Sequence, residues 1–73
     1  MNVEVRLFAT FRNDRGKKVF VEMEKPTPEK VLLSLGIKEE DVAILLINGL
    51  DGAFSTELVE GDYLSVFPPV GGG

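Results

Sequence analysis

The chemistry that this chain offers is concentrated at its C-terminal end, where residues 67–73 read Phe-Pro-Pro-Val-Gly-Gly-Gly. The two prolines lack amide donors and favour an extended path, and the three glycines let a large reagent approach the terminal carboxylate closely. The six residues after Phe67 reach at most about 20 Å from the body of the protein. We therefore predict that the Gly73 carboxylate is the reactive group and that this tail enters a channel in another protein. An unstructured end without a role is the alternative.

The residue types that most often carry catalysis are missing, because the 73 residues include no Cys and no His. The chain thus has no thiolate nucleophile, no imidazole base and no Cys- or His-based metal site. We expect a protein that is not catalytic alone and that binds no cofactor or metal. A net charge of −4 disfavours nucleic acid and favours a basic protein partner.

Two further features bear on the location of the protein. Its longest apolar run, residues 42–47, is far too short to cross a bilayer. The chain opens directly on a strand pattern, without the charged and apolar regions of a signal peptide. We therefore expect a cytoplasmic protein with no membrane partner.

The elements that must position the tail begin with two alternating segments. Period-two alternation predicts strands that bury one face. The inward residues of the first segment are predicted to be Val3, Val5, Leu7 and Ala9, and those of the second are Val19, Val21 and Met23. A turn cluster at residues 13–16 separates the two segments, so they predict an antiparallel hairpin.

A short helix follows this hairpin. Thr27 is a good N-cap, Pro28 suits the first helical position, and Gly36 is a natural C-terminal stop. Val31, Leu32 and Leu35 share one face of that helix. We interpret the charged residues 37–41 as a solvated loop.

The second half of the chain predicts further strands. The continuous apolar run at residues 43–47 predicts a strand buried on both faces in the middle of a sheet. The reversal after it falls at Asn48-Gly49 or at Asp51-Gly52. Residues 54–58 predict a short edge strand with a 3₁₀ turn, and residues 63–67 predict the last strand, with Leu64 and Val66 inward and Ser65 outward.

The resulting order is strand, strand, helix, strand, short strand and strand. It predicts an α+β fold in which a mixed sheet carries one main helix on one face, the ubiquitin-like β-grasp architecture. We assign residues 1–67 to this domain and residues 68–73 to an extended tail.

Two aromatic residues stand on the face of the sheet that alternation predicts to be polar. Phe8 lies on the first predicted strand and Phe67 ends the last one. Because these strands are neighbours in a β-grasp sheet, we predict that Phe8 and Phe67 form one exposed apolar patch at the root of the tail. Aromatic residues are enriched at protein interfaces, so we predict a partner-binding role for this pair. Phe20, on the same face, is interpreted as a cover for local backbone.

Three parts of the chain carry a resemblance to known proteins. They are the opening strand Val5-Arg6-Leu7-Phe8-Ala9-Thr10-Phe11-Arg12, the turns Ile47-Asn48-Gly49 and Glu60-Gly61-Asp62, and the ending Phe67-Pro68-Pro69-Val70-Gly71-Gly72-Gly73. In these motifs the sequence resembles the small subunit of molybdopterin synthase and related ubiquitin-like sulfur carriers, and the resemblance covers the whole chain. The family commonly has Ala where this chain has Gly71, and the ending Val-Gly-Gly-Gly is also similar to sulfur carriers of thiazole synthesis.

The resemblance implies a role in molybdenum cofactor biosynthesis. An ATP-dependent adenylating enzyme, related to ubiquitin-activating enzymes, would activate Gly73, and a sulfur donor would convert it to a thiocarboxylate. The large subunit of molybdopterin synthase, a sulfurtransferase, would then accept the tail through Phe8, Phe67, Pro68, Pro69, Val70, Gly71 and Gly72. Two alternatives stay open: a thiamine-pathway sulfur carrier, and a ubiquitin-like modifier whose activated glycine is joined to lysines of other proteins.

Overall fold

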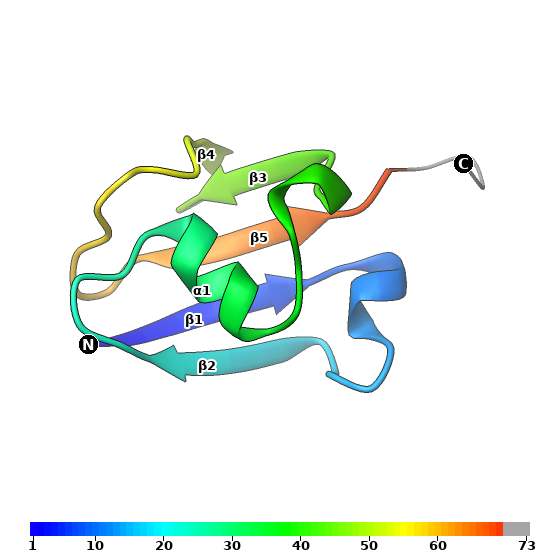
Figure 1. Cartoon of the computed structure of the whole chain (residues 1–73), viewed down its shortest axis with the longest axis horizontal. Helices are drawn as coiled ribbons and strands as arrows, with labels where there is room; N and C mark the ends of the chain where they lie inside the picture. Colours follow the sequence, from blue (N-terminus) through cyan, green and yellow to red (C-terminus); the bar gives the residue numbers. More distant parts are fainter. Residues whose placement is uncertain (70–73) are drawn as a thin grey trace.

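The computed structural model describes residues 1–69, which form a five-stranded mixed sheet with one α-helix packed on one face (Figure 1). The elements in chain order are β1 (Asn2–Leu7), η1 (Ala9–Arg12), β2 (Lys18–Glu22), α1 (Pro28–Ser34), η2 (Glu39–Asp41), β3 (Ile44–Ile47), β4 (Leu50–Asp51) and β5 (Tyr63–Phe67). The strand order is β2-β1-β5-β3-β4. The α+β prediction, a ubiquitin-like β-grasp with one main helix, is confirmed.

The central pair of strands, β1 and β5, is parallel, whereas every other pair is antiparallel. Leu7 lies opposite Val66 at the end of this parallel pair. Since parallel strands finish at the same edge of a sheet, the end of β1 and the end of β5 come together. That edge is where the C-terminal tail leaves the domain (Figure 1).

The helix α1 begins and ends as its sequence predicts. The Thr27 hydroxyl accepts a hydrogen bond from the Lys30 amide at 3.3 Å, and Pro28 occupies the first helical turn. Gly36, just beyond the C-terminal end, has a φ of 80°, a conformation that L side chains rarely adopt. The buried face of α1 then packs Val31 and Leu32 against the sheet.

The hydrophobic core lies between α1 and the sheet. Its fully or almost fully buried members are Val3, Val5, Leu7, Phe11, Val31, Leu32, Ile37, Leu45, Leu58, Leu64 and Val66. The predicted inward positions of β1 up to Leu7, and those of β5, are therefore correct, and Val19 and Val21 pack on the core as half-buried residues.

The prediction for residues 43–47 is wrong in one respect. The strand β3 is not buried on both faces, because Ile44 is 48% exposed and only Leu45 of its four residues is buried. The middle of the sheet belongs to β5 instead, which lies between β1 and β3. Ser65 is consequently only 7% exposed although it points to the face without a helix, so its predicted outward position did not make it accessible.

The β1 pattern also breaks earlier than predicted. The strand ends at Leu7, and Ala9 is exposed with a φ of 52° rather than inward. The chain then turns into η1, which buries Phe11. Alternation continues through Ala9 in the sequence, but the tight connection to β2 ends the extended backbone two residues earlier.

The remaining connections correct two further predictions and settle one alternative. Asn48 and Gly49 both have positive φ, 53° and 84°, and form the β3–β4 turn, so the reversal lies there. The short edge strand is Leu50–Asp51, whereas residues 54–58 form no strand. The predicted loop at residues 37–41 contains the short turn η2, and it also contributes buried Ile37.

Candidate functional site

The feature at the root of the tail is a stacked aromatic pair. Phe8 follows β1 and Phe67 ends β5, and their ring centroids lie 4.2 Å apart with the ring planes inclined by only 12°. Both side chains are half-buried. The parallel pairing of Leu7 with Val66 places these two rings side by side. The predicted juxtaposition is thus present, whereas its predicted role in partner binding stays a prediction.

Arg12 packs against the outer side of this pair. Its guanidinium carbon lies 5.2 Å from the centroid of the Phe8 ring, and its Nε donates a hydrogen bond to the Leu7 carbonyl at 2.8 Å. A guanidinium over an aromatic face is attracted by the ring quadrupole. The aromatic pair therefore has a fixed positive charge beside it, which would favour an acidic group on a partner.

Two aliphatic side chains extend the apolar surface, and sequence reasoning missed both. Ile44 lies opposite Phe67 in the sheet, and Leu46 lies opposite Ser65. Ile44 is 48% exposed and Leu46 is half-buried. We name Phe8, Ile44, Leu46 and Phe67 the tail-root patch. The signal that could have revealed it is the alternation of Ile44 and Leu46 against Leu45 and Ile47, which the uniformly apolar run concealed.

The opposite side of the tail root is hollowed. A depression of about 520 Å³ is lined by Thr10, Phe11, Arg15, Gly36, Ile37, Asp41, Pro68 and Pro69. Arg15, one of these lining residues, donates hydrogen bonds to the Leu35 carbonyl, at 3.0 and 3.1 Å, and to the Phe11 carbonyl at 3.2 Å. Arg15 thereby ties η1 to the end of α1, so the elements that surround the tail root are fixed to one another.

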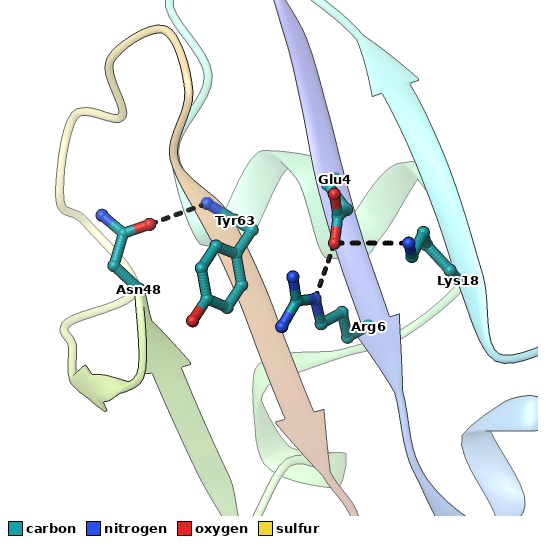
Figure 2. Close-up of polar contacts among 5 residues, drawn as sticks. All are labelled: Glu4, Arg6, Lys18, Asn48 and Tyr63. Atoms are coloured by element: carbon teal, nitrogen blue, oxygen red, sulfur yellow. Dashed lines mark hydrogen bonds and ion pairs between the residues drawn. The ribbon is translucent and has the colours of Figure 1, made fainter.

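The helix-free face of the sheet also carries a polar group around Glu4 (Figure 2). Glu4 Oε2 accepts a hydrogen bond from Arg6 Nε at 2.6 Å and lies 3.9 Å from Lys18 Nζ. The Arg6 guanidinium also lies over the Tyr63 ring, 3.9 Å from its centroid. The hydrogen bond from Arg6 lowers the pKa of the Glu4 carboxyl, and Lys18 adds to that effect. The charges of Glu4, Arg6 and Lys18 are therefore paired with one another, and Arg6 lies in the same row of the sheet as Ser65 and Leu46, next to the tail-root patch.

Asn48 fixes the start of β5 from the neighbouring turn. Its Oδ1 accepts from the Tyr63 amide at 3.0 Å, and its Nδ2 donates to Asp62 Oδ1 at 2.8 Å (Figure 2). The second oxygen of Asp62 accepts from the Val59 amide at 2.8 Å. These contacts join the two turns that the sequence resemblance singled out, and they hold the strand from which the tail departs.

The predicted site residues fall into two groups. Phe8 and Phe67 are in contact. Pro68, the residue after Phe67, is half-buried, and Pro69 is exposed. The predictions for Val70, Gly71, Gly72 and Gly73 lie outside the described residues. Within residues 1–69 no cluster of three or more acidic side chains is arranged to hold a metal ion. Over that same range no helix is long and apolar enough to cross a membrane.

Comparison with models of protein families identifies one family. A model of the ThiS family matches residues 5–73. A search of curated protein sequences finds no match.

Solved structures are similar over nearly the whole chain. A putative molybdopterin converting factor subunit 1 from Pyrococcus furiosus is 25% identical, with a TM-score of 0.77 over 96% of this chain and 99% of its own. A complex of subunits 1 and 2 of the molybdopterin-converting factor from Helicobacter pylori 26695 matches with 29% identity and a TM-score of 0.61 over the full length of both chains. SAMP1 from Haloferax volcanii shares the fold, at 23% identity and a TM-score of 0.76 over the full length of both chains.

The family match includes the parallel end of β1 and β5, the aromatic pair and the glycine tail, since it runs from Val5 to the last residue. The chain belongs to the ThiS family of ubiquitin-like sulfur carriers.

Proposed function

We propose that this protein is the small subunit of molybdopterin synthase and that it carries sulfur as a thiocarboxylate on Gly73 for molybdenum cofactor biosynthesis. The observation that carries the proposal is the stacked pair of Phe8 and Phe67 at the root of a tail that ends in Gly-Gly-Gly. Membership of the ThiS family supports sulfur carriage. Similarity to subunit 1 of two molybdopterin-converting factors favours this pathway over the thiamine pathway.

The chemistry follows from the terminal carboxylate. A free carboxylate is a poor electrophile, because neither oxygen is a good leaving group. The Gly73 carboxylate would attack the α-phosphate of ATP on the adenylating enzyme, with pyrophosphate as the leaving group. A donor of sulfide-level sulfur would then attack the acyl carbon of Gly73, the bond to AMP would break with AMP as the leaving group, and a thiocarboxylate would remain without any change of oxidation state. ATP would be held by the activating enzyme, because this chain has no His, no Cys and no glycine loop before a helix with which to perform the step.

The large subunit is the proposed acceptor of the loaded tail. The molybdopterin-converting factor of Helicobacter pylori is a complex of subunits 1 and 2, and the similarity extends over this whole chain. We propose that the tail-root patch docks on the large subunit while residues 68–73 reach its active site. An apolar patch next to the Pro68-Pro69 segment suits this division, because the patch would supply affinity and the residues after Phe67 would supply reach.

The experiment that tests the pathway is complementation in a cell that depends on this protein for molybdopterin. Deletion of Gly72 and Gly73 should abolish molybdopterin production, whereas Lys30→Ala, an exposed change in the first turn of α1, at the helix end opposite Gly36, should leave it intact. Normal production after the deletion would overturn the proposal. Loss of thiamine synthesis with normal molybdopterin would assign the chain to the thiamine pathway, and glycine-dependent ladders of higher-mass conjugates would identify a protein modifier instead.

A further inference from the structure

The free edge of β2 is a feature that the proposed function does not use. β2 is the outermost strand at one side of the sheet, and β1 pairs with it on the other side only (Figure 1). Phe20, at the centre of β2, is 59% exposed on the face without the helix. An exposed strand edge with a large apolar side chain is a template for pairing with another strand.

The ladder between β1 and β2 determines which backbone groups of β2 are available. The Leu7 amide donates to the Lys17 carbonyl at 2.9 Å, and the Met23 amide donates to the Met1 carbonyl at 3.0 Å. Hydrogen-bonded pairs alternate with non-bonded pairs in an antiparallel ladder, so the odd-numbered residues of β2 direct their backbone groups toward β1. Lys18, Phe20 and Glu22 therefore direct theirs toward the open edge.

The sequence of this edge is self-complementary about Phe20. Residues 17–24 read Lys-Lys-Val-Phe-Val-Glu-Met-Glu, basic on one side of the aromatic residue and acidic on the other. If two copies pair antiparallel with Phe20 opposite Phe20, Lys18 of each copy lies opposite Glu22 of the other. Opposite charges in facing positions stabilise a pair of strands.

In such a dimer the side chains that face each other are compatible on both faces of the joined sheet. On the helix-free face, two ion pairs flank the two Phe20 rings. On the other face, the half-buried Val19 of each copy lies opposite Val21 of the other and is covered further. A register shifted by two residues would instead place Lys18 or Glu22 opposite Phe20, so that an apolar ring faces a charge and both Lys18–Glu22 pairs are lost. Where Glu22 faces Phe20, Lys18 meets only Glu24, which lies beyond the end of β2.

We propose that two copies of this chain associate through their β2 strands, antiparallel and centred on Phe20, to form one continuous ten-stranded sheet. The interface is isologous, so each contact occurs twice and the assembly closes at two copies. Glu22 and Lys18 have competing contacts within one chain, with the N-terminal ammonium and with Glu4, and both remain largely exposed there. The contact is therefore weak and salt-sensitive, populated at about 1 mM protein.

This dimer does not depend on the chemistry of the tail. The β2 edge lies at the opposite side of the sheet from β3 and β4. The two-fold operation runs the two copies in opposite directions, so the two tails leave at opposite ends of the joined sheet. Each tail-root patch then remains open for its own partner.

The test uses the full chain in sedimentation equilibrium together with charge-reversal variants. The parent protein should form a dimer as its concentration approaches about 1 mM, and Glu22→Lys or Lys18→Glu should each weaken that dimer by about tenfold, since both symmetric pairs become repulsive. Mixing the two variants should restore association, because one copy then presents two lysines and the other two glutamates. Lys38→Glu, which has the same charge change away from β2, is the matched control and should leave the dimer unaltered.

A second measurement locates the contact. In amide NMR spectra of the parent protein, the Phe20 amide should shift and gain exchange protection with concentration more than the Val19 and Val21 amides, which already bond to β1. A monomer at every concentration, a dimer that is insensitive to the charge reversals, or shifts confined to another strand would each overturn the proposal. A chain that stays monomeric could still use this edge to pair with a strand of a different protein, and that result too would contradict the proposed dimer.

Discussion

The two faces of the sheet differ in what their side chains do. The face under α1 is filled by aliphatic side chains of β1 and β5 that are at most 1% exposed, namely Val3, Val5, Leu7, Leu64 and Val66. The other face is mixed. The paired charges of Glu4 and Arg6 lie beside Tyr63, and the tail-root patch lies next to them where the chain leaves the sheet.

This difference shows how one small domain separates folding from recognition. The helix-covered face supplies the apolar burial that stabilises the fold, because its side chains are removed from water almost completely. The helix-free face pairs the charges of Glu4, Arg6 and Lys18 and leaves exposed and half-buried apolar groups beside the tail. The parallel pairing of β1 and β5 produces that arrangement, since it brings residues from both ends of the sequence to one edge.

Removing side-chain volume from each face in turn should lower the unfolding free energy by different amounts. Leu64→Ala should cost about 2–5 kcal/mol of unfolding free energy, because it leaves a cavity in the core. Ile44→Ala, on the other face of the neighbouring strand, should cost within about 1 kcal/mol. Urea denaturation followed by circular dichroism measures both. Equal costs would mean that the two faces contribute alike to the fold.

Truncating Phe8 or Phe67 should affect binding to the large subunit. Phe8→Ala and Phe67→Ala should each weaken binding to the molybdopterin synthase large subunit by about tenfold or more, as expected for aromatic anchors at an interface centre. Isothermal titration calorimetry measures the affinity. Phe20→Ala is the matched control, because it removes the same side chain from the same face on β2. If all three variants lost affinity to the same degree, the tail-root patch would not be the docking surface.

Asn48 tests how firmly the start of β5 is held. Asn48→Ala removes hydrogen bonds to the Tyr63 amide and to Asp62, and it places alanine at a φ of 53°, so the unfolding free energy should fall by about 1–2 kcal/mol. Thermal denaturation measures the loss. Asn13→Ala, an exposed asparagine in the β1–β2 connection, should change stability far less. No difference between the two variants would show that the clamp does not support β5.

Disrupting the Glu4–Arg6 pair on the helix-free face should have the smallest effect, a change in how the stability of the fold depends on pH. The pKa of Glu4 is lowered in the folded chain, chiefly by the hydrogen bond from Arg6. The stability contributed by this pair is therefore present above the ordinary pKa of a glutamate, and it is lost as pH falls through the lowered value. Arg6→Gln should raise the pKa of Glu4 toward its ordinary value and reduce the acid-induced loss, as followed by carbon NMR of the Glu4 carboxyl. An unchanged Glu4 titration in Arg6→Gln would remove Arg6 as the cause.

The elements of the fold were accessible from local sequence signals. Alternation identified β1, β2 and β5, and the Thr27 cap with Gly36 bounded α1. The accessibility of individual side chains depends on the order of the strands, which these local signals do not report. Because β5 occupies the middle of the sheet, Ser65 is buried, and because β3 lies farther out, Ile44 is exposed. A period-two pattern reports which face a side chain is on, but its accessibility depends on which strands lie beside it.

The candidate site was likewise predictable from the sequence only in part. The meeting of Phe8 with Phe67 was predictable, because it needs only a parallel pairing of the first and last strands. The contributions of Ile44 and Leu46 were not, because a continuous apolar run hides which side chains face outward. The hydrogen bonds of Asn48 to Asp62 and to the Tyr63 amide depend on two turns 14 residues apart meeting in space, and no local pattern signals that contact.

Sulfur carriage on Gly73 is tested most directly by the intact mass of the purified chain after incubation with the adenylating enzyme, ATP and a sulfur donor. The expected result is a shift that equals the replacement of one oxygen by one sulfur, localised to Gly73 by fragmentation. The mass should return to that of the carboxylate when the large subunit and its pterin substrate are added. An unchanged mass in the complete reaction, with the adenylating enzyme shown to be active on a known carrier, would contradict the proposed function.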